Sequence, residues 1–397
     1  FGAGEASVRT QPPRRPRSRG GRARGQRPRG VRPARAAERR DGGGGSATDL
    51  SDREKTVRWA NWTAYLDMDD AGKTYPTLTA FEKESGIKVT YTEDIDDNDT
   101  YFNKIAPQLR AKQDINRDIF TFTDWMANRI IREGLCQPLE LLQMPNASNL
   151  LAPLKDVSFD PGRQYSLTWQ SGFAGIGYHK KKVGRELKAI EDLWADDLKG
   201  RISVLSEFRD TLGLIMQAQG VDPSGDFTQA QFEAATGEID KRLTDGYIRR
   251  IKGNSYLNDL KSGNAVAGIV WSGDLFILRA ETEDDDWEFV IPESGGMLWS
   301  DNLMVPITSQ HRRNAQRVMD YYYDPKVAAE VAAWVNYICP VEGAREEMEK
   351  IDPELAESPF IFPSEDYIAD HDIVGFRALS SQEDADYSAL WARTVGN

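Results

Sequence analysis

The sequence has very few residues of the types that build metal sites and disulfide scaffolds. It contains two cysteines, Cys136 and Cys339, and three histidines among 397 residues. The cysteines lie far apart and form no C-x-x-C pair, so the sequence supports neither a zinc module nor a disulfide framework. We therefore expect no metal ion and no cofactor.

The motifs of several enzyme classes are also absent. The chain has no G-x-S-x-G nucleophile motif, no P-loop and no dinucleotide-binding fingerprint. Gly172, Gly175 and Gly177 have the wrong spacing for a phosphate loop and indicate a closely packed strand instead. No apolar run approaches the ~18 residues that a membrane-spanning helix needs.

Acidic residues strongly outnumber basic ones outside the N-terminal segment. Residues 1–48 contain 13 arginines and three acids, a net charge of +10, so the remaining 349 residues carry −23. A body this acidic repels nucleic acid and anionic membrane surfaces and attracts cations. We therefore expect no nucleic-acid partner.

Residues 1–48 consist mainly of Arg, Pro and Gly and are too poor in apolar side chains to form a core. We predict a disordered tail and linker. Because no apolar segment precedes Trp59, no signal peptide can be read. We interpret residues 1–41 as a mis-framed secretory leader and residues 42–48 as a flexible tether; a basic arm for nucleic acid or anionic lipid is the alternative.

From Lys55 onward, β-branched or aromatic runs alternate with segments of helical period. The pattern predicts strands at 57–60, 87–91, 118–122, 165–169, 174–179, 201–205, 266–271, 287–291 and 297–305. It predicts helices at 76–86, 101–109, 124–135, 189–195, 210–219, 228–243, 255–262, 312–323 and 326–335. This order is typical of an α/β fold with a largely parallel sheet, arranged in two lobes with a ligand cleft between them.

Aromatic residues stand beside acids or hydroxyls in short segments at the ends of these elements. The segments are residues 61–65, 123–125, 206–210, 271–274 and 295–301. A tryptophan face attracts an organic cation and covers its methylene groups, and carboxylates give charge-assisted hydrogen bonds to ammonium groups. Aromatic walls with acidic ends therefore indicate a linear cationic ligand.

These segments resemble those of the polyamine-binding proteins of ABC importers, the spermidine/putrescine-binding family with a type II periplasmic-binding-protein fold. The resemblance covers residues 55–397 and rests on the following motifs: Asn-Trp-Thr-x-Tyr after the first strand, Glu-Ser-Gly-Ile-Lys-Val, Arg-Glu-Gly-Leu, Ile-Val-Trp-Ser-Gly and Gly-Gly-x-x-Trp-x-Asp. It implies two lobes joined by crossover strands, with capture of the ligand by hinge closure. The first lobe is expected at 55–168 plus 300–345, and the second at 169–299 plus 346–397.

The resemblance also implies ligand-binding roles for first-lobe residues near the strand ends. Trp62, Thr63 and Tyr65 match residues that line the cleft after the first strand. Thr123 stands where the family commonly has Ser, and Trp125 stands where it has an aromatic residue.

Further ligand contacts implied by the resemblance are two acids at a helix start, two tryptophans flanking the methylene chain, a carboxylate that grips an amine, and a tyrosine near the hinge. The two acids are Glu207 and Asp210, and the two tryptophans are Trp271 and Trp299. The carboxylate is Asp301, and the tyrosine is Tyr337. The two acids are exchanged relative to the family pattern, and a C-terminal glutamine of the family has no clear counterpart near Gly375 to Arg377.

The sequence thus predicts a monomeric, extracytoplasmic solute-binding protein without catalytic activity, periplasmic or anchored to the outer face of the cell membrane. It would capture putrescine or spermidine and deliver it to an ABC transporter permease. One alternative is a receptor for a sugar or another organic cation on the same fold. A second is a hydrolase in which Glu207 and either Asp210 or Asp301 act as general acid and base.

Overall fold

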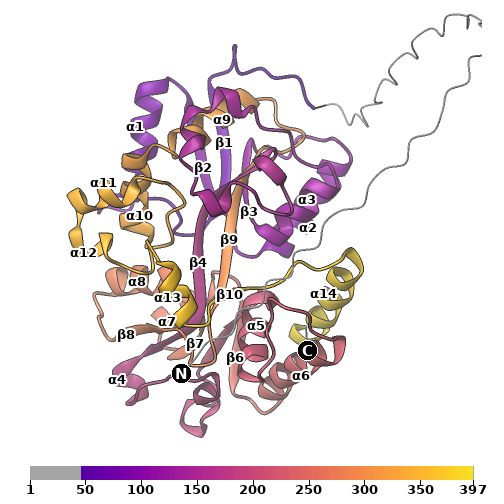
Figure 1. The fold of residues 1–397 in the computed structure, drawn as a ribbon, viewed down its shortest axis with the longest axis vertical. Helices are drawn as coiled ribbons and strands as arrows, with labels where there is room; N and C mark the ends of the chain where they lie inside the picture. Colours follow the sequence, from indigo (N-terminus) through magenta and orange to yellow (C-terminus); the bar gives the residue numbers. More distant parts are fainter. Residues whose placement is uncertain (1–45, 397) are drawn as a thin grey trace, which may run out of the picture. The chain divides into compact units, whose positions relative to one another are not determined.

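The computed structural model describes residues 46–396 (Figure 1). The predicted disordered tail at 1–48 and the proposed leader at 1–41 therefore lie almost wholly outside the described residues. Within the described part, no helix is both long enough and apolar enough to cross a membrane.

A single mixed sheet joins the described residues. Its strands are β1 (Thr56–Trp62), β2 (Lys88–Ile95), β3 (Ile119–Thr123), β4 (Ser166–His179), β5 (Ile202–Leu205), β6 (Ile248–Lys252), β7 (Ala267–Trp271), β8 (Trp287–Val290), β9 (Met297–Met304) and β10 (Val374–Gly375). The spatial order is β2-β1-β3-β9-β4-β7-β5-β6, with β8 paired to β4 and β10 paired to β9. Strands β1–β3 form one parallel group and β5–β7 form another. Between the groups, β9 pairs antiparallel with β3, β4 pairs antiparallel with β7, and β4 and β9 pair antiparallel with each other.

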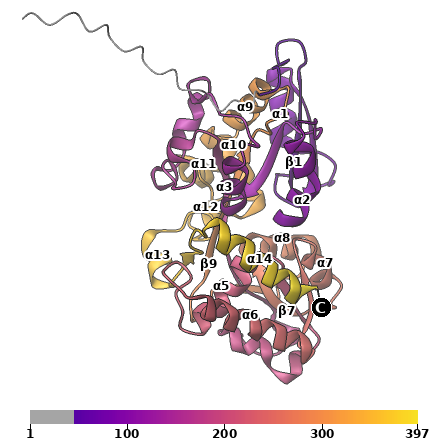
Figure 2. The same cartoon turned by 90° about the vertical axis from the view of Figure 1, so that its right-hand side faces the viewer.

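The helices cover both groups of parallel strands. They are α1 (Pro76–Ser85), α2 (Asn98–Arg110), α3 (Asp124–Arg132), α4 (Lys180–Val183), α5 (Phe208–Ala218), α6 (Gln229–Thr244), α7 (Tyr256–Lys261), α8 (Ser272–Thr282), α9 (Arg312–Tyr321), α10 (Pro325–Val335), α11 (Ala344–Ile351), α12 (Pro353–Ala356), α13 (Glu365–Asp370) and α14 (Ser381–Val395). In Figure 1, α1–α3 and α9 surround β1–β3, whereas α5–α7 lie around β5–β7. Figure 2 shows the C-terminal helix α14 lying across α5 and α6.

Two antiparallel strands, β4 and β9, run through the centre of the sheet and connect its two parallel groups (Figure 1). Strand β4 is one continuous strand, and all fourteen of its residues are buried. The sequence pattern instead predicts two strands here, at 165–169 and 174–179. The predicted interruption coincides with a shift in pairing between Thr168 and Ser171, a bulge that breaks the alternating pattern without ending the ladder.

The structure differs from the other predicted elements in detail. Residues Ile190–Trp194 form a 3₁₀ helix rather than an α-helix. Strand β6 is not predicted by the sequence pattern. It is an edge strand, and its exposed Arg249 and Arg250 interrupt the run of apolar residues that marks a buried strand. The expected lobe boundaries fall inside β4, β9 and α11, within one compact unit that contains all the described residues, and they stay a prediction.

The ends of the strands place the predicted ligand-binding segments together. Strand β3 passes directly into α3, and β7 passes directly into α8, while two residues separate β5 from α5 and β2 from α2. The carboxyl ends of parallel strands meet at one edge of each group, where α/β folds bind their ligands. Because β9 lies beside both β3 and β4, its residues near Asp301 face the same region.

A buried arginine, Arg163, forms hydrogen bonds to both crossover strands, β4 and β9. Arg163 donates to Asn302 Oδ1 in β9 at 2.9 Å and to Thr168 Oγ1 in β4 at 2.7 Å, and these two residues are partners in the β4–β9 ladder. Its side chain is almost completely excluded from solvent. Removing it leaves buried polar groups without their partner, which is costly.

We predict that Arg163→Met lowers the free energy of unfolding by about 2–4 kcal/mol, because the polar partners in β4 and β9 lose a charged donor. Urea unfolding followed by tryptophan fluorescence measures this change. Arg185→Met is the control, since Arg185 lies on the surface and makes one ion pair there with Asp197, worth at most about 1 kcal/mol. Equal effects of the two substitutions would contradict the fastening role of Arg163.

Candidate functional site

A cavity lies at the strand ends described above, where residues of both parallel groups and of β9 converge. About 400 Å³ of space there is not filled by atoms, a figure that includes space open to solvent. Its lining combines aromatic rings with side-chain oxygens and amides: Trp62, Thr63, Tyr65, Asn98, Thr123, Glu207, Asp210, Asn254, Trp271, Asp274, Trp299, Asp301 and Tyr337.

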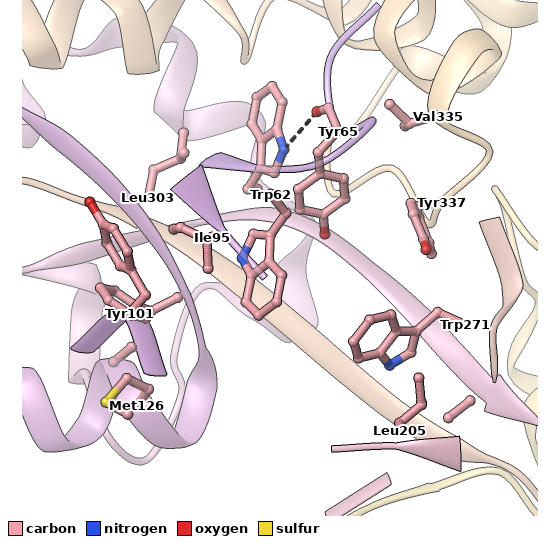
Figure 3. Close-up of a cluster of buried hydrophobic side chains, with 14 of the residues drawn as sticks. Trp62, Tyr65, Ile95, Tyr101, Met126, Leu205, Trp271, Leu303, Val335 and Tyr337 are labelled. Atoms are coloured by element: carbon pink, nitrogen blue, oxygen red, sulfur yellow. Dashed lines mark hydrogen bonds between the residues drawn. The ribbon is translucent and has the colours of Figure 1, made fainter. Parts of the chain in front are cut away.

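Five aromatic side chains form a continuous wall around this cavity. The ring centroids of Trp62 and Trp271 are 6.2 Å apart, those of Trp271 and Trp299 6.3 Å, those of Trp299 and Tyr337 5.2 Å, and those of Tyr337 and Tyr65 5.5 Å. Figure 3 shows four of these side chains, Trp62, Tyr65, Trp271 and Tyr337. Such a wall offers aromatic faces to a cation and to its methylene groups.

Two glycines allow this wall to close. A Cβ atom on Gly172 of β4 would lie 2.5 Å from Trp299 Cζ2 and 2.7 Å from Tyr337 Cδ1, and one on Gly273 would lie 2.7 Å from the Tyr337 ring. Any larger residue at these positions would push the rings away. Gly172, which the sequence pattern assigned to a closely packed strand, therefore also shapes the site.

Asp301 of β9 is held by two hydroxyl donors. Thr123 Oγ1 donates to Asp301 Oδ1 at 2.6 Å, and Tyr65 donates to Asp301 Oδ2 at 2.9 Å. Burial raises the pKa of Asp301, and the nearby charges of Asp124 and Glu207 raise it further. The two hydrogen bonds lower it by less, so the pKa of Asp301 is about 7. The carboxyl group thus lacks the positive partner that its ionised form requires.

Glu207 and Asp210 stand at the start of α5. Trp125 Nε1 donates to Glu207 Oε2 at 3.0 Å, and Trp271 Nε1 donates to Asp210 Oδ2 at 2.8 Å. Burial raises the pKa of both carboxyls, and for Asp210 the neighbouring Glu207 raises it further. Arg209 forms an ion pair with Glu207 at 3.4 Å. Its charge lowers the pKa of both acids, but by less than burial raises it.

A fourth carboxylate, Asp274, lines the cavity from the first turn of α8. It accepts hydrogen bonds from Tyr256 at 2.8 Å, Tyr337 at 2.8 Å and Asn254 at 3.1 Å. Burial raises its pKa to about 6 despite these donors. Four carboxyl groups therefore share one cavity, and among the residues that line it in the described structure no lysine or arginine occurs.

Ten of the eleven residues predicted as ligand contacts line this one cavity, namely Trp62, Thr63, Tyr65, Thr123, Glu207, Asp210, Trp271, Trp299, Asp301 and Tyr337. Trp125 does not line it, because its indole lies behind Glu207 and faces a neighbouring cavity. Whether these residues bind the ligand stays a prediction, but their gathering around one space is what that prediction requires.

The sequence reasoning missed three lining residues, Asn98, Asn254 and Asp274. Asp274 belongs to the segment Trp271 to Asp274, which already carried an aromatic residue beside an acid, so its signal was present. Asn254 lies in the short connection between β6 and α7, and no aromatic residue or acid beside it marked it as a candidate. Asn98 opens α2 and donates to Thr123 and Glu207, a pairing across distant segments that no sequence pattern carries.

One group of possible metal ligands exists among residues 46–396, formed by His179, Asp284 and Asp286. It does not line the cavity. His179 Nε2 is 3.0 Å from Asp284 Oδ2, and Asp286 forms an ion pair with Lys181 at 2.6 Å. These side chains thus bind one another and the neighbouring lysine.

Comparison with known proteins places this geometry in a family. Residues 76–359 match the family model described as bacterial extracellular solute-binding protein. The spermidine/putrescine-binding periplasmic protein of Escherichia coli is 26% identical over 320 residues, which cover 80% of this chain and 86% of that protein. The putrescine-binding periplasmic protein PotF of Escherichia coli is 25% identical over 334 residues, covering 80% and 85%.

Solved structures show the same fold. A Listeria monocytogenes protein assigned to a spermidine/putrescine ABC transporter aligns with a TM-score of 0.73 and 25% identity, over 86% of this chain and 99% of that chain. The substrate-binding protein PotD of Streptococcus pneumoniae gives a TM-score of 0.66 at 23% identity, over 86% and 98%. The predicted α/β, two-lobed type II periplasmic-binding-protein fold with crossover strands is confirmed.

We predict that Gly172→Ala displaces the rings of Trp299 and Tyr337, because the added methyl group would overlap both. The substitution should lower the melting temperature by several degrees, since overpacking of this kind costs about 1–3 kcal/mol. Differential scanning calorimetry measures the loss. Gly237→Ala is the matched control, because no atom lies within 4 Å of a Cβ built there in helix α6. If Gly172→Ala melted like Gly237→Ala, the close approach would not constrain the wall.

Proposed function

The chain belongs to the family of bacterial extracellular solute-binding proteins, and from this premise we propose that it binds a polyamine, putrescine or spermidine, in the aromatic cavity. It then delivers the polyamine to the permease of an ABC importer. The observation that carries the proposal is the gathering of Glu207, Asp210, Asp274 and Asp301 inside five aromatic rings with no basic side chain in the lining. Polyamine-binding relatives in Escherichia coli support it.

The electrostatics of the cavity favour a ligand with more than one positive charge. Burial raises the pKa of all four carboxyls, so their ionised forms are unfavourable while the cavity holds no cation. An alkyl diamine brings two ammonium groups separated by methylenes. Its charges compensate the acids, and its methylenes lie against the tryptophan faces.

Six of the predicted residues have a defined role in this arrangement. Asp301, oriented by Thr123 and Tyr65, grips one ammonium group. The second ammonium group lies near Asp210, which Trp271 orients through its indole N–H. Trp271 and Trp299, whose rings are 6.3 Å apart, flank the methylene chain.

Contacts across the cavity support capture by closure of two lobes, at 55–168 plus 300–345 and 169–299 plus 346–397. Asn98 and Trp125 of the first lobe both donate to Glu207 of the second. Beside them, Ser206 Oγ donates to Asp97 Oδ2 at 2.5 Å. These bonds form only when the lobes meet, so a ligand that compensates the acids stabilises the closed arrangement.

The family consists of solute-binding proteins and not of enzymes, so the expectation of no catalytic activity holds and a carboxylate-dependent hydrolase is not favoured. A sugar would leave the buried acids without positive partners, which disfavours that alternative. The relatives are periplasmic proteins or, in Treponema pallidum, a lipoprotein, and the location is extracytoplasmic. A monomer that carries no nucleic acid completes the proposal.

We predict that putrescine or spermidine raises the melting temperature of the protein and changes its tryptophan fluorescence at micromolar to submillimolar concentration. Asp301→Asn should weaken binding by about 30- to 1000-fold, because a desolvated charge pair is lost. Its ligand-free melting temperature should not fall, because the substitution removes a buried charge that lacks a positive partner.

Asp245→Asn serves as the matched control, since Asp245 is exposed and pairs with Lys241 on the surface. It should bind as the wild type does. The proposed function is wrong if neither polyamine shifts the fluorescence or the melting temperature at millimolar concentration. Equal affinities of Asp301→Asn and the wild type would remove Asp301 from the site.

We predict that affinity falls as the pH is lowered. Without ligand, the pKa of Asp301 is about 7 and that of Asp274 about 6. A bound cation favours the ionised carboxylates, so binding below pH 7 must first release protons from these groups. Affinity at pH 5.5 should be roughly 30- to 100-fold weaker than at pH 8. Calorimetry in buffers of different ionisation enthalpy should detect the released protons, and a pH-independent affinity would contradict this role of the acids.

A further inference from the structure

Two connections between a strand and a helix, far apart in the sequence, meet beside the aromatic cavity. The first, Asp96 and Asp97, joins β2 to α2, and the second, Gly253 to Ser255, joins β6 to α7. Strands β2 and β6 are the first and the last in the spatial order of the sheet. The two ends of that order therefore come together at this contact, although the crossover strands β4 and β9 lie between them in the sheet.

Three hydrogen bonds join the two connections. The backbone N–H of Asn254 donates to the Asp96 carbonyl oxygen at 3.0 Å. The backbone N–H of Ser255 donates to Asp96 Oδ1 at 2.7 Å, and its Oγ donates to Asp96 Oδ2 at 3.3 Å. We call this contact the seam and define it by Asp96, Gly253, Asn254 and Ser255. Every donor belongs to the proposed second lobe and every acceptor to the proposed first lobe, so these bonds exist only while the lobes meet.

Gly253 makes the closest approach in the seam. A Cβ atom built on Gly253 would lie 1.8 Å from the carbonyl oxygen of Asp96 and 2.7 Å from its carbonyl carbon. Gly253 is buried, and it is not among the glycines with positive φ. Its own backbone conformation therefore does not require glycine. What requires glycine here is the backbone of the other lobe, which occupies the place of a side chain.

A second glycine of the same lobe meets a similar obstacle inside that lobe. A Cβ atom on Gly268 in β7 would lie 1.9 Å from the carbonyl oxygen of Ser203 in β5. Strands β5 and β7 are paired neighbours, so their contact persists whether the lobes are open or closed. Only the obstacle at Gly253 disappears when the lobes separate.

Asn254 links the seam to the cavity. Its backbone N–H donates to Asp96 across the seam, and its side-chain Nδ2 donates to Asp274 Oδ2 at 3.1 Å. Asn254 and Asp274 line the cavity, whereas Gly253 does not. The contact between the lobes thus fixes the backbone of a residue that orients one of the buried carboxyl groups.

We propose that Gly253 is a positioning residue for ligand binding, which acts through closure of the lobes and not through contact with the ligand. The absence of a side chain at Gly253 lets the second lobe reach the backbone of Asp96. Asn254, held in place by this contact, then presents its amide to Asp274. The inference rests on the proposed function, because it takes the cavity as the polyamine site and the lobes as parts that move.

Gly253→Ala in the full chain tests the inference. The added methyl group would overlap Asp96 only when the lobes are closed, so the affinity for putrescine and spermidine should fall about 10- to 100-fold. The melting temperature without ligand should not fall, because the open arrangement accommodates the methyl group. Titration calorimetry measures the affinity. Small-angle X-ray scattering should show that a polyamine reduces the radius of gyration of the wild type more than that of the variant.

Two further glycine variants serve as matched controls. Gly268→Ala should lower the melting temperature without ligand by several degrees, because its overlap with Ser203 is present in the open and the closed arrangement. Gly237→Ala should bind both polyamines as the wild type does, since no atom lies within 4 Å of a Cβ built there. The three variants introduce the same methyl group and differ in what it meets.

The outcomes separate this inference from the proposed function. Wild-type affinity of Gly253→Ala for both polyamines would overturn the inference. A ligand-free melting temperature that falls as in Gly268→Ala, or failure of Gly253→Ala to fold, would also overturn it, because the contact would then belong to the ligand-free fold. If neither polyamine binds the wild type, the proposed function is wrong, and the inference falls with it.

Discussion

The desolvation of four carboxyl groups in one aromatic cavity is the constraint on which the other features of the site depend. Glu207 and Asp210 come from the start of α5, Asp274 from the start of α8 and Asp301 from β9, and burial raises the pKa of each. Hydroxyl, amide and indole donors orient them, and the one nearby positive charge, that of Arg209 beside Glu207, does not offset the burial. A cation that enters the cavity therefore gains more than it would from the same acids in water, which gives a binding protein both affinity and a reason to close.

The crossover strands make this arrangement possible. Strands β4 and β9 belong to the same ladder, and β9 carries Trp299 and Asp301 to the place where β3 and β7 end. Gly172 on β4 leaves room for the rings of Trp299 and Tyr337. The sheet thus positions the acids, and its glycines determine how closely the aromatic wall can surround a methylene chain.

Much of the fold could be predicted because the hydrophobic pattern is strong where strands are buried on both faces, as in β3, β5 and β7. The edge strand β6 and the bulge in β4 could not, because exposed charge and a local shift in pairing break the pattern on which prediction rests. At the site, Trp62 and Asp301 stand in motifs that sequence reasoning could find. Asn98 could not be found, since its partners Thr123 and Glu207 are distant in the chain.

The sequence by itself determined that aromatic residues and acids follow the strands, because residue type and strand ends are local properties of the chain. It also determined the separation of a basic N-terminal segment from an acidic body. Only the tertiary structure decided which acids share one cavity, that Asp274 joins them, and that Trp125 lies behind Glu207 and faces a neighbouring cavity. The physical reason is that burial and hydrogen-bond partners arise from segments that folding brings together, so the charge that is left without a partner cannot be known before the fold is formed.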